Sequence, residues 1–227
     1  MQAEFVLDYR SPYCYLANTQ MKRLGAQIVY TPVDIVSVMK EVNNQPSSMC
    51  PAKAKYAGID AARWARHYDV PFSPNGGVLE ALKLGQLDKT LFSRAGAAAK
   101  EMGIFKQVSD ALLEAVWAGA DDLTTDKGRS SFLASRSIRS DLWEIAASPE
   151  IAHQLAANDQ NAAERGVFGI PTFFVDGEMF FGTRQQRPFT LAFGEKCQSA
   201  PKPCNTAMQG WRCCRARSDL EALLPGS

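Results

Sequence analysis

The sequence predicts an α/β fold in which a long helical block interrupts a small sheet. Three observations predict this fold. The first 31 residues have the pattern of strand, helix and strand, residues 34–165 are helical in pattern, and strand character returns at residues 172–181. A chain of 227 residues is long enough for one domain that carries a large insertion.

The opening segment is predicted to be a strand, a crossover helix and a second strand. Residues 4–8 form the first strand, and Ser11 is a favourable N-cap with Pro12 at the first helical position. The helix is expected over residues 12–24, ended by a glycine, and residues 27–31 form the next strand. Such a crossover makes the two strands parallel.

The helical block is inferred from composition and punctuation. Alanine is abundant and runs of β-branched residues are absent, which favours helices, while Gly and Pro cluster at residues 70–77. Helices are predicted at residues 60–68, 88–102, 108–117, 130–147 and 149–158.

A β-hairpin is predicted to complete the sheet. Residues 172–175 and 178–181 are rich in Phe and Val, and Asp176-Gly177 between them is a strong two-residue turn signal. The domain assignment is therefore a discontinuous domain of residues 1–36 and 165–227, with an atypical tail after residue 182, and a helical insertion domain of residues 37–164.

Composition excludes several classes of function. The chain has 25 basic and 24 acidic residues, so it lacks the basic excess that a nucleic-acid partner requires. No apolar run approaches the roughly 18 residues of a membrane span, and no membrane partner is expected. The N-terminus lacks a basic region followed by an apolar stretch, so a cytoplasmic protein is expected.

Cysteines are distributed unevenly, with four of the six in the last 46 residues. In a cytoplasmic chain reduced thiols are expected rather than a disulfide framework. The four tail cysteines lack a paired zinc spacing, so no metal site is predicted. They are Cys197, Cys204, Cys213 and Cys214.

The first motif with chemical meaning is Ser11-Pro12-Tyr13-Cys14, placed between the first strand and the first helix. Redox enzymes that place Cys-x-x-Cys here use the helix N-terminus to stabilise a thiolate. Ser11 replaces the first cysteine, and a hydroxyl cannot form a mixed disulfide. Ser11 is therefore either a simple N-cap or a hydrogen-bond donor to a thiolate from another molecule. Cys14 is expected to be a small core residue, with a mixed disulfide as the alternative.

The second motif is Ile170-Pro171, directly before the third strand. Paired with the first motif, it predicts a cis peptide bond that leaves the backbone of Ile170 available to an extended peptide. The alternative is a trans proline at the start of an edge strand.

Together these motifs resemble one family in their order and spacing over residues 4–182. The chain resembles the 2-hydroxychromene-2-carboxylate isomerases and the kappa-class glutathione transferases, in the DsbA-like branch of the thioredoxin superfamily. The resemblance implies a thioredoxin-like fold with an all-helical insertion domain. It is carried by residues 8–17, 44–46, 51–56, 60–65, 166–173 and 175–177.

The resemblance implies glutathione as cofactor. In such proteins the serine at the position of Ser11 hydrogen-bonds the glutathione sulfur, and the residue before the cis-proline, here Ile170 before Pro171, pairs with the cysteinyl backbone. Residues at the positions of Asn44 and Lys53 help to hold the tripeptide, and Thr183 matches a small residue of the same site. Without the resemblance, the better interpretation of Asn44 is a loop residue and that of Lys53 is a solvated charge on a helix face.

The resemblance implies an isomerase that acts on a small aromatic-derived substrate through reversible addition of glutathione thiolate, and a homodimer. A glutathione transferase, a thiol oxidoreductase and a non-catalytic glutathione binder are the alternatives. Arg184 departs from the family pattern, because an aspartate that contacts the glutathione ammonium is expected there. The residues after Thr183 also lack the family's closing helix, so weaker glutathione binding is expected.

Overall fold

The structure is a computed structural model that describes residues 3–24 and 28–182. The expectations for Thr183, Arg184 and the tail cysteines lie outside the described residues. In chain order the described elements are β1 (Ala3–Leu7), α1 (Pro12–Leu24), β2 (Ile28–Pro32), α2 (Ile35–Glu41), the short 3-10 helix η1 (Ser47–Met49), α3 (Pro51–Tyr68), α4 (Gly76–Lys83), α5 (Leu91–Glu101), α6 (Phe105–Trp117), α7 (Asp126–Ser135), α8 (Leu142–Ala146), α9 (Pro149–Glu164), β3 (Thr172–Val175) and β4 (Glu178–Phe181).

The described strands form one mixed sheet in the order β2-β1-β3-β4. β1 is parallel to β2 and antiparallel to β3, and β3 and β4 form an antiparallel hairpin. The crossover unit and the hairpin are therefore confirmed. Because α2 to α9 all lie between β2 and β3 in sequence, the two strands that complete the sheet come from residues that follow the helical block.

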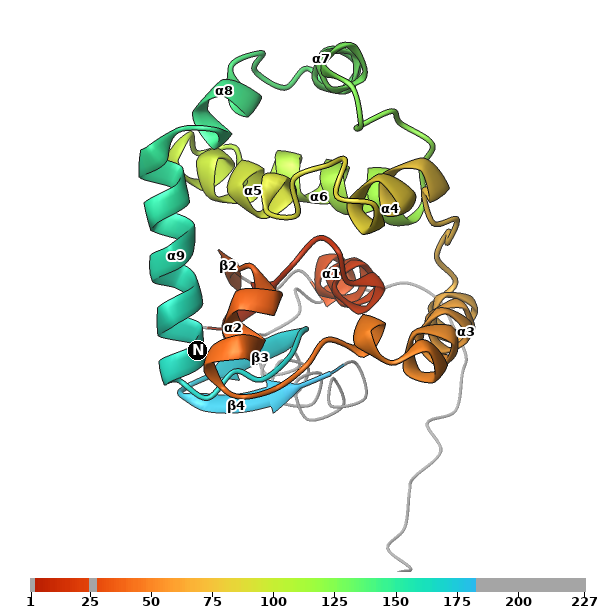
Figure 1. Ribbon diagram of the computed structural model, residues 1–227, viewed down its shortest axis with the longest axis vertical. Helices are drawn as coiled ribbons and strands as arrows, with labels where there is room; N and C mark the ends of the chain where they lie inside the picture. Colours follow the sequence, from red (N-terminus) through yellow and green to blue (C-terminus); the bar gives the residue numbers. More distant parts are fainter. Residues whose placement is uncertain (1–2, 25–27, 183–227) are drawn as a thin grey trace, which may run out of the picture.

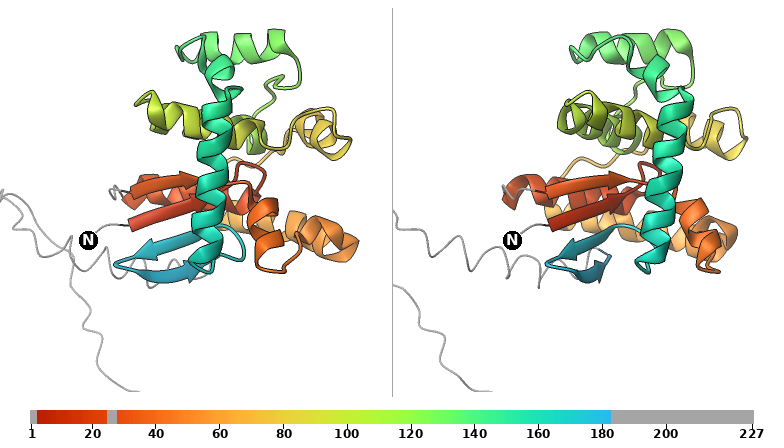
Figure 2. Two further views of the ribbon diagram at one scale, coloured as in Figure 1. Left: turned by 60° about the vertical axis from the view of Figure 1, so that its left-hand side comes forward. Right: turned by 90° about the vertical axis from the view of Figure 1, so that its left-hand side faces the viewer.

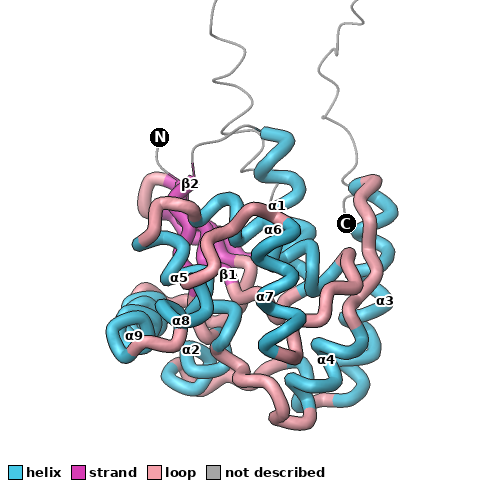
Figure 3. The backbone as a smooth tube through the Cα atoms, turned by 90° about the horizontal axis from the view of Figure 1, so that it is seen from above, coloured by secondary structure: helices cyan, strands magenta, loops and turns pink. Residues whose placement is uncertain are grey.

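The helical block is layered against the sheet domain. Figure 1 shows α1 next to the sheet, α5 and α6 beyond it, and α7 and α8 outermost. α9 runs from that outer layer back to the β3-β4 hairpin (Figure 2). Viewed from above, β1 and β2 lie between α9 on one side and α3 on the other (Figure 3).

One apolar core connects the sheet with the helical block. Phe5 and Phe173 of the sheet belong to the same buried cluster as Leu16 of α1, Phe92 of α5 and Leu112 of α6. A smaller cluster, which includes Val6 and Phe174, fills the space between the sheet and the helices α2 and α9. The sheet is thus covered on both faces.

One helix prediction was wrong. Residues 130–147 were expected to form one helix, but α7 ends at Ser135 and α8 begins at Leu142. Ser137 between them has φ of +53°, a left-handed conformation that a continuous helix excludes. Across the described ranges, no helix has both the length and the apolar character needed to cross a membrane.

Candidate active site

Ser11 lies at the start of α1, directly after the turn that follows β1. Its backbone N–H donates to the Asp8 carbonyl over 3.1 Å, which closes that turn. Its own carbonyl accepts from the N–H of Cys14 over 3.1 Å and of Tyr15 over 3.4 Å. Ser11 is half-buried. A hydroxyl is therefore held at the positive end of a helix of 13 residues, next to amides that favour an anion.

Cys14 lies one helical turn further on and is fully buried. Burial raises the pKa of its thiol well above the ordinary value, although hydrogen bonds with the Asp8 backbone and the Ser11 side chain act in the opposite direction. The sulfur therefore stays protonated beneath Ser11. This agrees with the expectation that Cys14 is a core residue.

The Ile170-Pro171 peptide bond is cis, as expected. Val6 of β1 pairs with Thr172 of β3 in antiparallel register, so the end of β1 lies beside the start of β3. Ser11 and Pro171 consequently lie at the same edge of the sheet. Within the described part of the chain, no hydrogen bond occupies the backbone N–H or C=O of Ile170. These two groups are available to pair with a bound peptide.

Asn44 lies at this edge as well. Its side-chain Nδ2 donates to the carbonyl of Phe168 over 2.7 Å, and its Oδ1 accepts from the Gln45 N–H over 2.8 Å. Asn44 thus ties the loop after α2 to the segment that ends in Ile170 and Pro171. This link joins residues 124 apart in sequence.

Lys53 is exposed in the first turn of α3. Among the described residues its side chain has no hydrogen bond or ion pair. The same helix is fixed against α1 further along, where the Tyr13 hydroxyl donates to Asp60 Oδ2 over 3.0 Å. Lys53 is therefore placed on a helix attached to α1, but no contact joins it to Ser11 or Ile170.

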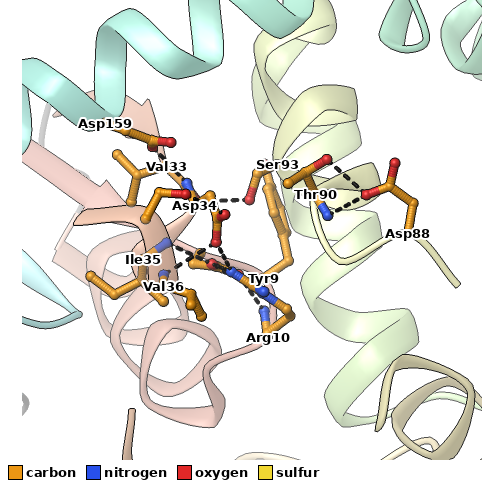
Figure 4. Close-up of polar contacts among 12 residues, drawn as sticks. Tyr9, Arg10, Val33, Asp34, Ile35, Val36, Asp88, Thr90, Ser93 and Asp159 are labelled. Carbon is orange, nitrogen blue, oxygen red and sulfur yellow. Dashed lines mark hydrogen bonds and ion pairs between the residues drawn. The ribbon is translucent and has the colours of Figure 1, made fainter. Parts of the chain in front are cut away.

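A charged cluster beside Ser11 was missed by the sequence reasoning. Arg10 forms an ion pair with Asp34 (Figure 4) and a second one with Asp8. Asp8 Oδ1 also accepts from the Arg10 backbone N–H over 2.9 Å. Asp8 Oδ2 accepts from the N–H of Ile35, the first residue of α2, over 3.1 Å. The turn before Ser11 is thereby bonded to the start of α2.

Asp159 of α9 completes this cluster. Its Oδ1 accepts from the Asp34 backbone N–H over 2.7 Å. Burial, and then the charges of Asp34 and Asp8, raise the pKa of Asp159 to about 7, while the Asp34 N–H and Arg10 act to lower it. The sequence contained a signal for Asp8 and Asp34, namely their position just after a strand. Asp8 follows the last residue of β1 and Asp34 lies two residues after β2, at the edge of the sheet where Ser11 lies. For Asp159 there was none, since an aspartate in a polar helix has the pattern of a solvated residue.

Comparison with known proteins identifies the relatives of this chain. The model of the DSBA-like thioredoxin domain matches residues 2–193. A 2-hydroxychromene-2-carboxylate isomerase of Pseudomonas putida is 28% identical over 211 residues, which cover 87% of this chain and 97% of the relative. Glutathione S-transferase kappa 1 of Homo sapiens is 24% identical over 217 residues, covering 90% and 96%. The resemblance inferred from the motifs is confirmed.

Solved structures agree on the fold. A 2-hydroxychromene-2-carboxylate isomerase superposes with a TM-score of 0.71 at 23% identity, covering 87% of this chain and 97% of the other. The cytosolic disulfide reductase DsbM of Pseudomonas aeruginosa, solved with GSH, superposes with a TM-score of 0.57 at 13% identity, covering 88% and 100%.

Proposed function

The chain belongs to the DSBA-like thioredoxin domain family, and on that basis we propose that it is a glutathione-dependent isomerase of 2-hydroxychromene-2-carboxylate or a similar unsaturated keto acid. One observation carries the proposal. The position that could hold a reactive cysteine at the start of α1 holds the hydroxyl of Ser11, above a Cys14 that burial keeps protonated. Such a site is suited to a sulfur anion supplied by another molecule.

The energetics support this role for Ser11. A thiol of ordinary pKa must have that pKa lowered by about 2 units to be mostly ionised at pH 7, which requires about 2.7 kcal/mol. A hydrogen bond to a charged acceptor contributes about 1.5–3 kcal/mol, and a helix N-terminus about 0.3–1 kcal/mol. The Ser11 hydroxyl and the first turn of α1 together suffice without a further base.

The described residues fit glutathione. The free backbone N–H and C=O of Ile170, before Pro171, would pair with its cysteinyl part, as an added strand pairs with a sheet edge. Asn44 supports that contact by holding the Phe168 carbonyl two residues away. Lys53 would help to hold the tripeptide, and Thr183, which lies outside the described residues, matches a small residue of the site in the family pattern. When bound, glutathione supplies a thiolate that adds to the conjugated double bond, allows rotation about it and is released unchanged.

The setting follows from this chemistry. We propose that the substrate is a small aromatic-derived acid and that the protein works in the cytoplasm, where thiols are kept reduced. The family resemblance seen in the motifs implies a homodimer, and we propose that assembly for this chain. Arg184 replaces an expected acidic residue, so glutathione binding is weaker than in the relatives.

The test of the proposal is Ser11→Ala in the full chain. We expect kcat/KM for isomerisation of 2-hydroxychromene-2-carboxylate with glutathione to fall about 100-fold, a typical loss for one stabilising donor. The thiolate absorbance of bound glutathione near 240 nm should disappear together with the activity. Ser130→Ala, a matched substitution on the exposed side of α7, should leave both unchanged. Full activity in Ser11→Ala would refute the proposal.

A transferase is the second candidate, favoured by the relatives named glutathione S-transferase kappa 1. It would consume glutathione by conjugation to an electrophile, whereas an isomerase regenerates it. Parallel assays with 1-chloro-2,4-dinitrobenzene and with 2-hydroxychromene-2-carboxylate separate the two. Loss of free glutathione in step with product identifies the transferase.

A further inference from the structure

The cluster beside Ser11 holds more negative than positive charge. Two carboxyl groups, those of Asp8 and Asp34, pair with the guanidinium of Arg10. A third, that of Asp159, lies on the other side of Asp34 and accepts from the Asp34 backbone N–H (Figure 4). Asp8 and Asp159 are buried, and Asp34 and Arg10 are only 13% and 16% exposed. With all three carboxyls ionised, the net charge in this poorly solvated space would be −2. Because that arrangement is costly, burial favours the form of the cluster in which one carboxyl keeps its proton.

The contacts show which carboxyl retains it. Asp8 and Asp34 each form an ion pair with Arg10, so these two carboxyl groups share the positive charge of the guanidinium. Asp159 has no such partner in the described part of the chain, where its one hydrogen bond comes from the Asp34 N–H. A neutral carboxyl can still accept that bond through its carbonyl oxygen. The proton therefore resides on Asp159.

The contacts also connect Asp159 to Ser11. Asp159 holds the Asp34 backbone, and the Asp34 carboxylate accepts from the Val36 N–H over 3.2 Å and from Ser37 Oγ over 2.8 Å at the start of α2. The same carboxylate pairs with Arg10, which is the residue before Ser11. Ionisation of Asp159 would repel the Asp34 carboxylate and thereby disturb its pairing with Arg10.

We propose that neutral Asp159 is a positioning residue for Ser11, acting through Asp34 and Arg10, and that loss of its proton displaces the Ser11 hydroxyl and lowers activity. The activity part of this inference rests on the proposed glutathione-dependent reaction. The structural part does not, because the bonded path from α9 to Ser11 lies wholly within the described residues.

The other charged groups near Asp159 leave this assignment intact. Asp159 lines a groove between α2 and α9, and Glu41 of α2 and Glu164 of α9 line that groove as well and add further negative charge. Arg94 of α5 pairs with Asp88, and Lys100 of α5 donates to the Tyr30 carbonyl. On α9 itself, exposed His153 lies six residues earlier and interacts with Glu150, while on α8 Glu144 precedes the start of α9. Among these described groups, none supplies a positive partner to Asp159.

The first experiment is an NMR titration of the full chain without glutathione. We expect the backbone amide signals of Arg10 and Ser11 to shift between pH 5 and pH 8.5 with the same midpoint as the Asp159 carboxyl carbon. Asp159→Asn keeps an oxygen that accepts the Asp34 N–H but cannot ionise, so in this variant both amide signals should stay constant. Glu164→Gln, which removes a charge from the same groove, should leave the wild-type titration in place.

The second experiment measures kcat/KM of the isomerase reaction against pH. The ratio of Asp159→Asn to wild type should rise about threefold or more between pH 6 and pH 8.5, because only the wild type loses the proton. For Glu164→Gln the ratio should stay flat.

The two experiments separate the possible failures. Amide signals of Arg10 and Ser11 that do not follow Asp159 in the wild-type titration would overturn the positioning role, and that measurement requires no variant to fold. Coupled amide shifts without any glutathione turnover would leave the positioning role standing and refute the proposed function. A flat activity ratio in an active enzyme would show that the displacement does not reach the reaction.

Discussion

The start of α1 carries a hydroxyl, that of Ser11, and a thiol, that of Cys14. Of these two groups, only the hydroxyl is accessible to a ligand. Ser11 is half-buried at the start of the helix, whereas Cys14 is enclosed by the core. Burial disfavours the charged form of a thiol and also blocks reagents from reaching it. Cys14 is therefore a packing residue despite its place next to the proposed sulfur site.

This difference predicts selective alkylation of the cysteines. Iodoacetamide at pH 8 should modify half-buried Cys50 readily and Cys14 at least about 100-fold more slowly, because the raised pKa of Cys14 leaves little thiolate. Residue-resolved mass spectrometry of the full chain measures both rates. After unfolding in guanidinium chloride the two rates should converge. Rapid labelling of Cys14 in the native protein would contradict its assignment to the core.

At the scale of the elements, α5 packs against Tyr9, which lies in the turn between β1 and Ser11. The Tyr9 side chain is buried, its hydroxyl donates to Ser109 Oγ over 3.2 Å, and its carbonyl accepts from Trp117 Nε1 over 2.8 Å. A Cβ added at Gly96 of α5 would lie 2.3 Å from the Tyr9 hydroxyl. Because Gly96 has no side chain, α5 can approach Tyr9 in the turn before Ser11.

Gly96→Ala should therefore destabilise the protein by about 1–3 kcal/mol, the usual cost of overpacking a core. The matched control is Gly58→Ala on α3, where a Cβ meets nothing within 4 Å and should stabilise the helix by up to about 1 kcal/mol. Chemical denaturation of both variants measures the two changes in the free energy of unfolding. A Gly96→Ala variant as stable as the wild type would show that α5 can retreat from Tyr9.

The elements also show which features could be predicted from sequence. The crossover unit and the hairpin were predictable because Ser11-Pro12 and Asp176-Gly177 encode local geometry. The break between α7 and α8 was not, because Ser137 carries no turn signature and its left-handed conformation accompanies the hydrogen bond from the Ile138 N–H to the Leu133 carbonyl. In the site, the place of Ser11 at the start of α1 and the cis bond at Pro171 could be predicted from motifs, while the role of Ser11 toward a thiolate stays a prediction. The bond between Asp34 and Asp159 spans 125 residues, and no local pattern encodes it.

At the scale of the whole molecule, α9 links the outer helical layer to the sheet. Asp159 on this helix makes the free energy of unfolding of the protein depend on pH. The pKa of Asp159 is 3.8 ordinarily and about 7 in the folded chain, so between these values the folded state holds a proton that the unfolded state has released. Stability from this group is fully present below about pH 4 and declines as the pH rises to about 7.

Asp159→Asn should remove that decline. Relative to the wild type, the variant should gain about 2–3 kcal/mol in the free energy of unfolding between pH 5 and pH 8, since the two pH units from 5 to 7 correspond to about 1.36 kcal/mol each. Urea unfolding at several pH values gives the comparison, and Glu164→Gln should show no such gain. A constant difference across the range would mean that Asp159 ionises normally in the folded protein.

The strand order has a consequence for how the protein is made. β1 lies between β2 and β3, yet about 140 residues separate the end of β2 from the start of β3, a stretch that a ribosome needs about 7–28 s to synthesise. Throughout that interval the backbone N–H and C=O groups on the β3 side of β1, at Phe5 and Val6, have no strand partner and are open to pairing with other chains. Chaperone demand during synthesis should therefore be concentrated on the amino-terminal strand and end only when the hairpin emerges.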